Sequence, residues 1–211
     1  MNRITDRIFL GDINGATNLY QLRKNKITHI LTMAAGIRPL YKKEFKYKIV
    51  NVMDIPSQNI ISHFDRAIEF INKAVTGGGR VLVHCFAGVS RSASTVIAYF
   101  MATRKMTFAE AFNYVKKKRP IIFPNFGFQK QLVEYEALLE ERSKKKEVKF
   151  KDEQTEEKKR TIEFDPKDSS SFTPFLKSNK MGLLGVQKPH KKYARSPGKP
   201  AQVKPKQFHY P

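Results

Sequence analysis

The stretch Arg80–Met101, RVLVHCFAGVSRSASTVIAYFM, constrains the fold more than any other part of the chain. Its first residues form a short β-branched run that is typical of a buried strand, and Ser92–Thr103 is so apolar that it predicts a buried helix. Only the segment Cys85–Arg91 separates the two. An α/β sheet binds anions at the loop between a strand's carboxyl end and a helix's amino end. We therefore expect an anion site at this loop.

Further strands and helices alternate over the first 145 residues. Ile27–Met33, Tyr47–Val52 and Arg80–His84 are strand-like. Ser62 with Asp65, and Thr107 with Glu110, are spaced as helix caps, and Pro120 ends a helix. The helices predicted are Ala16–Lys24, His63–Val75, Ser92–Thr103, Thr107–Lys118 and Phe126–Arg142. The pattern predicts an α/β fold with a central, mostly parallel sheet flanked by helices.

The apolar pattern, rather than the charge, divides the chain. Apolar segments recur from Ile8 to Leu139, whereas the sequence after Arg142 is rich in Lys, Glu, Ser and Pro. Such a segment buries too little apolar surface to offset its chain entropy. We expect a folded domain over residues 1–145 and a disordered, Lys-rich tail over residues 146–211.

Composition excludes several classes of protein. The single cysteine excludes an internal disulfide framework and a multi-cysteine zinc site, and it suits a reducing compartment. No apolar run approaches the roughly 20 residues of a membrane span, and the first residues do not resemble a signal peptide. We expect a cytoplasmic or nuclear protein with no metal and no cofactor. The net charge of +21 predicts anionic partners, although the sparse aromatics and interspersed acids of the tail argue against nucleic acid and membranes.

The loop itself carries the chemistry. Its small residues let the backbone curl, so that the N–H groups of Phe86–Arg91 form a nest that matches the three oxygens of a phosphoryl group. The same amides would stabilise a thiolate at Cys85, because cysteines at helix amino ends have lowered pKa values. Arg91 can bind two phosphoryl oxygens through its planar fork. The small residues are Ala87, Gly88 and Ser90.

These motifs resemble a known family. HCFAGVSRS is similar to the signature loop of cysteine-dependent protein tyrosine phosphatases, and AYFM (Ala98–Met101) resembles their dual-specificity branch. GDINGATNLYQLRKNKITHIL resembles the opening of that branch, and PNFGFQKQL its final helix. The likeness covers about residues 3–140 and indicates a small, atypical member.

The resemblance implies a role for each loop residue. Cys85 would be the nucleophile, Arg91 the phosphate ligand, and Ser92 the hydroxyl that eases release of the thiolate. His84 would orient the loop and tune the thiolate, unless it is simply a core histidine, and Ser92 is alternatively a helix cap. The substrate-binding loop would comprise Phe86, Ala87, Gly88, Val89, Ser90 and Arg91.

The family also requires a general acid on a loop before the cysteine. Asp54 lies 31 residues before Cys85, just past a predicted strand and two residues before Pro56. One carboxyl group there could protonate the leaving oxygen and then deprotonate water. Asp65 and Asp12 are less well placed, and the alternative for Asp54 is a turn-forming role.

The expected function is hydrolysis of phosphotyrosine and phosphoserine or phosphothreonine in proteins. The alternatives are a phosphatase of phosphoinositides or RNA 5′ ends, and a phosphobinding scaffold without turnover. The uncharged Phe86, Ala87 and Val89 favour a phosphoprotein, and Cys85, Arg91 and Asp54 give no reason to expect an inactive relative.

The tail holds two similar segments, Lys144–Phe150 (KKKEVKF) and Lys158–Phe164 (KKRTIEF). Each places basic residues before two apolar residues separated by one position, which resembles the extended docking peptides that MAP kinases bind. A MAP kinase is therefore an expected partner. The alternative is a solvated charge run.

Overall fold

The computed structural model describes residues 1–162 and contains a five-stranded sheet in the order β1-β2-β5-β3-β4. β2, β5, β3 and β4 are parallel, and β1 pairs antiparallel with β2 at the edge. The strands are β1 (Asn2–Arg3), β2 (Ile8–Gly11), β3 (His29–Met33), β4 (Lys46–Val50) and β5 (Val81–His84). The predicted α/β fold class is confirmed.

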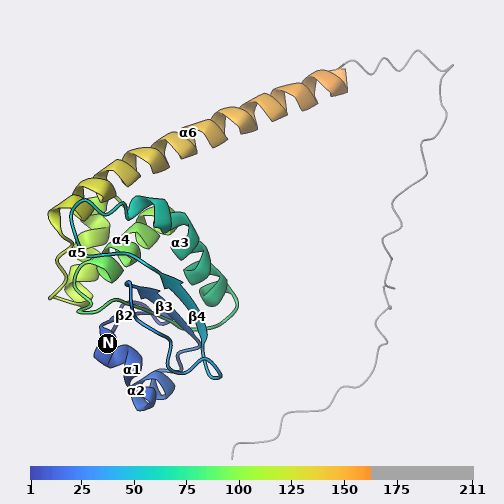
Figure 1. Cartoon of the computed structure of the whole chain (residues 1–211). Helices are drawn as coiled ribbons and strands as arrows, with labels where there is room; N and C mark the ends of the chain where they lie inside the picture. Colours follow the sequence, from blue (N-terminus) through green and yellow to red (C-terminus); the bar gives the residue numbers. More distant parts are fainter. Residues whose placement is uncertain (163–211) are drawn as a thin grey trace, which may run out of the picture. The chain divides into compact units, whose positions relative to one another are not determined.

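Helices cover the sheet on both faces (Figure 1). Two short helices lie on one face, and four helices lie on the other. The short helices are α1 (Ile13–Thr17) and α2 (Leu19–Lys24); the others are α3 (Ile61–Thr76), α4 (Arg91–Arg104), α5 (Phe108–Lys118) and α6 (Phe126–Ile162). The central strand β5 thus has a helical layer on each side, and its carboxyl end carries Cys85.

Alternation along the strands creates two cores. In β5, Val81 and Val83 pack into the large core under α3, α4 and α6, whereas Leu82 points into the small core under α1 and α2. Successive side chains of a strand point to opposite faces, so a strand covered on both sides must be apolar throughout. α4 is buried along most of its length, which fixes its amino end behind the loop that starts at Cys85.

Two local predictions need correction. The helix expected over Ala16–Lys24 is broken at Asn18, whose side chain accepts a hydrogen bond from the Gln21 N–H and so begins a second helix. Ser62 does not cap α3; Asn59 Oδ1 accepts from the Ser62 N–H instead. The capping box of Thr107 and Glu110 is confirmed.

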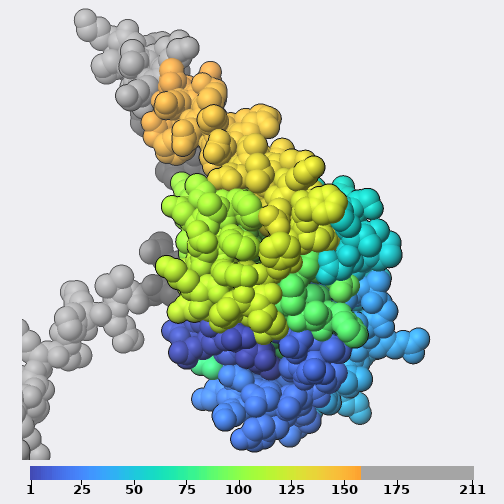
Figure 2. All heavy atoms as spheres, turned by 90° about the vertical axis from the view of Figure 1, so that its left-hand side faces the viewer, coloured from blue at the N-terminus to red at the C-terminus, as the bar shows by residue number. Residues whose placement is uncertain are grey.

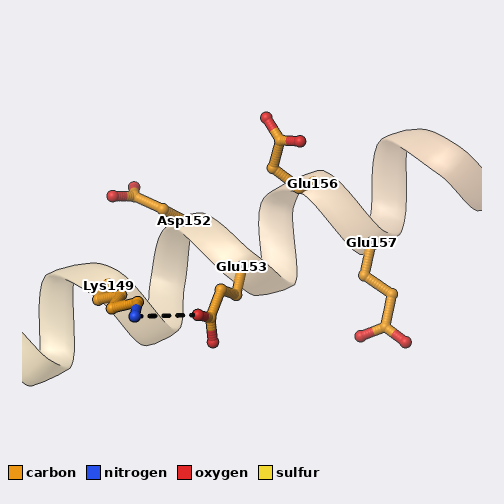
Figure 3. A pocket seen from close by; sticks show the side chains of 5 residues that line it. All are labelled: Lys149, Asp152, Glu153, Glu156 and Glu157. Carbon is orange, nitrogen blue, oxygen red and sulfur yellow. Dashed lines mark ion pairs between the residues drawn. The ribbon is translucent and has the colours of Figure 1, made fainter.

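α6 continues far beyond the predicted domain boundary. The structure is helical to Ile162, so residues 146–162 are not the unstructured segment that the sequence pattern predicted. Arg142 pairs with Asp65 of α3 at 3.0 Å, and residues 143–157 are exposed. Within that stretch the helix is supported by ion pairs between its own side chains, such as Lys149 with Glu153 at 3.9 Å (Figure 3). Residues 163–211, which hold the rest of the predicted tail, lie outside the described residues.

The first predicted docking segment, Lys144–Phe150, is part of α6 and is therefore helical. Val148 and Phe150 are both exposed on α6, but residues two apart on a helix point in directions about 200° apart. They therefore cannot enter one groove together as an extended peptide would. The second segment, Lys158–Phe164, extends past the described residues.

Candidate active site

The loop Cys85–Arg91 wraps around the Cys85 sulfur. The Gly88 N–H and the Ser92 hydroxyl both donate hydrogen bonds to Sγ, each at 3.2 Å. Cys85 is buried, with 1% of its surface exposed, and it sits at the carboxyl end of β5 and the amino end of α4. Donors aimed at a sulfur stabilise it as the thiolate, which is the nucleophilic form.

The outward carbonyl groups of the loop are held by donors from three other segments. Phe86 O accepts from the Ile13 N–H at 2.9 Å, and Val89 O accepts from the Phe123 N–H at 2.9 Å. Between them, Gly88 O accepts from Arg119 Nε at 2.9 Å and Ala87 O from Arg119 Nη2 at 3.4 Å. These four consecutive carbonyls are thus fixed from outside.

Arg119 binds two of these carbonyl groups and is itself held in place. Its side chain is 5% exposed and also binds Asn2 Oδ1 at 2.6 Å and Asp12 Oδ2 at 3.4 Å. Figure 2 shows the dark blue amino-terminal segment lying against the yellow-green region that contains Arg119. Arg119 could not be predicted as part of the site, because it lies far from Cys85 along the chain and no local pattern marks the contact.

Gly88 is the one loop position that requires glycine. Its φ of +67° is unfavourable for other residues, and a Cβ there would overlap the carbonyl oxygen of Gly11. The loop can therefore pass directly over the end of β2.

His84 supports the loop from inside the sheet. Its Nε2 lies 2.8 Å from Thr32 Oγ1 on β3, and its Nδ1 lies 3.2 Å from the Cys85 carbonyl oxygen. Burial lowers the pKa of His84. The imidazole is then neutral, with Nδ1 as the donor to the carbonyl and Nε2 as the acceptor from Thr32. These two contacts join the Cys85 carbonyl group to β3 through the His84 ring.

Asp54 lies beside both Arg91 and the loop. Asp54 Oδ2 is 3.4 Å from Arg91 Nε, and Asp54 Oδ1 accepts from the Ser90 hydroxyl at 2.6 Å. Arg91 Nη1 donates to Val52 O at 3.2 Å. Arg91 Nε is the only buried side-chain nitrogen or oxygen atom without a hydrogen-bond partner in the part of the chain that the structure describes. A buried donor of this kind suits a phosphoryl oxygen.

The start of α6 positions the loop that carries Asp54. Asn125 Nδ2 donates to Asp54 Oδ1 at 2.9 Å, while Asn125 Oδ1 accepts from the Phe128 N–H at 3.0 Å and so caps α6. Gln131 Oε1 accepts from the Ile60 and Ile61 N–H groups at 2.8 and 3.1 Å. The sequence PNFGFQKQL therefore supplies the groups that hold the loop carrying Asp54, whereas its pattern alone predicts only a helix.

The structure brings together all the predicted site residues, from Asp54 through the Cys85 loop to Ser92. Asp65, on α3, instead pairs with Arg142 of α6, and Asp12 caps α1 and binds Arg119. Among residues 1–162 no group of three or more His, Cys, Asp or Glu side chains is arranged to hold a metal ion. In the same range no helix is long and apolar enough to cross a membrane.

Comparison with known proteins assigns the domain. Residues 8–138 match the family described as dual specificity phosphatase, catalytic domain. The chain belongs to the dual specificity phosphatase family. This supports protein tyrosine and serine/threonine phosphatase activity, and the catalytic cysteine is present as Cys85.

Relatives at 42–45% identity share the catalytic region. Dual specificity protein phosphatase 1 of Arabidopsis thaliana is 42% identical over 65% of this chain and 69% of its own length. MAP kinase phosphatase with leucine-rich repeats protein 2 of Dictyostelium discoideum is 45% identical over 63% of this chain but only 19% of its own length. The crystal structure of human tyrosine phosphatase-like serine/threonine/tyrosine-interacting protein is 43% identical, with a TM-score of 0.62 over 65% of this chain and 96% of that one.

The buried His84 should make the domain sensitive to mild acid. Because its pKa is lowered in the folded chain, the unfolded chain binds the proton first as the pH falls below about 6.5. Folding stability should then decrease from pH 7 to pH 5, by at most about 1.4 kcal/mol per pH unit for this one proton. Melting temperatures across this range should fall less steeply for His84→Asn than for the native chain. Equal slopes would contradict the assignment of a neutral, buried imidazole.

Gly127 should be required for the position of Asp54. A Cβ at this residue would overlap the Pro56 carbonyl group, so Gly127→Ala must push the acid loop away from α6. General acid catalysis is worth about 10²–10⁴-fold, and a displaced carboxyl group loses part of it. We expect turnover of a phosphoserine peptide to fall about 10-fold or more, and turnover of an aryl phosphate with a good leaving group to fall less. Equal losses, with the melting temperature retained, would contradict this role.

Proposed function

We propose that the chain hydrolyses phosphotyrosine, phosphoserine and phosphothreonine in proteins through a phosphocysteine intermediate. One observation carries the proposal: Asp54, Arg91 and the Cys85 loop meet at one point, through the 2.6 Å contact of Asp54 with Ser90 and its 3.4 Å contact with Arg91. A proton source, a phosphate ligand and a nucleophile are what a phosphate ester needs for cleavage.

In the first step the Cys85 thiolate attacks phosphorus. The S–P bond forms as the ester P–O bond breaks, and the protonated Asp54 carboxyl group gives its proton to the leaving oxygen. Arg91 and the loop amides stabilise the charge on the three remaining phosphoryl oxygens.

In the second step a water molecule attacks the phosphocysteine. The Asp54 carboxylate takes a proton from this water, the new P–O bond forms and the S–P bond breaks. The Ser92 hydroxyl, 3.2 Å from Sγ, stabilises the departing thiolate. Inorganic phosphate leaves, and Asp54 is again protonated for the next cycle.

A phosphobinding scaffold remains the contrasting function. It would use the same loop and Arg91 to hold a phosphorylated residue, without the chemistry at Cys85 and Asp54. The presence of both groups, in contact with the loop, favours turnover.

Substitutions at the two chemical groups should separate these functions. Cys85→Ser should reduce turnover to background while retaining phosphopeptide binding, since Arg91 and the loop amides remain. Asp54→Asn should lower turnover of phosphopeptides about 10²-fold and that of an activated aryl phosphate much less, because a good leaving group needs little protonation. Steady-state kinetics on both substrates measure this. An active Cys85→Ser chain would refute the covalent mechanism.

We further propose that the basic tail binds a MAP kinase and that the protein works in signalling in the cytoplasm or nucleus. The family includes the Dictyostelium MAP kinase phosphatase named above. Because Val148 and Phe150 point away from each other on α6, the proposal now rests on Lys158–Phe164. Residues 158–162 form the end of α6, so this last part of the helix would have to unwind to bind as an extended docking segment.

The two segments provide matched variants for this proposal. Ile162→Ala with Phe164→Ala should weaken capture of a purified MAP kinase at least 10-fold, because the apolar pair of the docking segment is lost. Val148→Ala with Phe150→Ala is the control and should change capture less than twofold. If both pairs leave capture unchanged and moderate salt abolishes it, the tail acts only as a polycation.

A further inference from the structure

Exposed apolar side chains gather on the three loops that build the active site. Thirteen large apolar residues are exposed in the described part of the chain; five of them lie on these loops and a sixth is the first residue of α6. Phe86, Phe123 and Phe126 are each 64% exposed. We call the six the apolar rim: Met53, Ile55, Phe86, Ile121, Phe123 and Phe126.

Direct contacts join the three loops around Cys85. The Phe123 N–H donates to Val89 O at 2.9 Å, which ties the segment before α6 to the Cys85 loop. Asn125 donates to Asp54 at 2.9 Å, and Ser90 donates to the same carboxylate at 2.6 Å. Each rim residue lies within three positions of a residue that makes one of these contacts. The rim therefore belongs to the segments that meet around Cys85.

The rim lacks the positive charge that marks the rest of the chain. The segments 52–60, 86–90 and 121–127 contain neither Lys nor Arg, although the protein has a net charge of +21. Lys130 lies 6.0 Å from the Phe126 ring, and the Arg91 side chain is only 13% exposed. By contrast, residues 23–48 hold eight basic residues and one acidic residue.

This distribution limits what the entrance can accept. A polyanionic substrate, such as a phosphoinositide or a strongly acidic peptide, would find no cation on the three loops besides Arg91. A substrate with one phosphoryl group, which would bind Arg91, and apolar residues beside it would match both Arg91 and the apolar rim. Exposed apolar surface next to a binding site commonly serves to bind a partner.

We propose that the apolar rim selects phosphoprotein segments with aromatic or long aliphatic side chains on both sides of the phosphorylated residue. The proposal rests on the phosphatase function proposed above and names its substrate class. The flanking side chains pack against Phe123, Phe126 and the other rim residues, while the phosphoryl group reaches Arg91. Covering one large apolar side chain gives roughly a tenfold gain in binding.

Three phosphotyrosine peptides test the proposal. They are identical except that Leu and Phe, Ala, or Glu flank the phosphotyrosine. The native chain should show a kcat/KM at least 10-fold higher for the apolar-flanked peptide than for the Glu-flanked peptide. The double variant Ile121→Ser and Phe126→Ser should reduce this ratio to about two or less, and its turnover of p-nitrophenyl phosphate should stay within twofold of the native value.

A matched control uses two exposed apolar residues of α6 that lie outside the rim. Val133→Ser with Leu138→Ser removes comparable surface and should leave the peptide ratio unchanged. A native chain without preference, or a preference that survives in the rim variant, would overturn the proposal. So would rim-dependent binding to phosphatidylcholine–phosphatidylserine vesicles without peptide preference, since the rim would then contact a membrane.

The two proposals can fail separately. If the native chain turns over neither aryl phosphate nor peptide, the phosphatase function fails. The rim is then tested by binding of the three peptides to the Cys85→Ser chain, in which the same ranking supports the rim and equal affinities refute it.

Discussion

The site depends on holding one short loop in a shape that its own residues could not maintain. Four consecutive carbonyls of the Cys85 loop accept hydrogen bonds from Ile13, Arg119 and Phe123, which belong to distant parts of the chain. Buried carbonyl groups without partners would be costly, so these donors make the curled form the stable one. The fold around the loop places these donors: Ile13 is the first residue of α1, and Arg119 directly follows α5.

The loop that carries Asp54 is also held by hydrogen bonds from a distant part of the chain, in this case the start of α6. Asn125 serves at once as the cap of α6 and as a donor to Asp54, so the beginning of the helix and the position of the carboxylate are linked. Gln131 and the close approach of Gly127 to Pro56 complete the link. Nucleophile and acid thus come from separate loops whose spacing is set by α4 and α6.

The elements that could be predicted from the sequence are those that a local pattern of residues encodes. The apolar strand before Cys85 and the buried helix after Arg91 follow from short-range features, whereas the choice of Asp54 rested on the family resemblance. Arg119, Asn125 and Gln131 could not be predicted, because the partners that link them to the site are 31 to 117 residues away and nothing in the local pattern marks them. The Ser62 cap was wrong because Asn59 offered a better-placed acceptor. The helix over residues 146–162 was not predicted, because the composition of this segment shows only that it has too few apolar residues to form a core. Ion pairs between oppositely charged side chains four residues apart can still support an exposed helix.

The solitary cysteine has a consequence for how the molecule can be observed. Because the chain has one thiol in 211 residues, the thiol content of a preparation equals its content of reduced Cys85. A thiol reagent therefore reacts at this one position, with no background from other cysteines. The Ser92 and Gly88 hydrogen bonds to this sulfur make its reactivity a direct report on whether the loop has kept its shape.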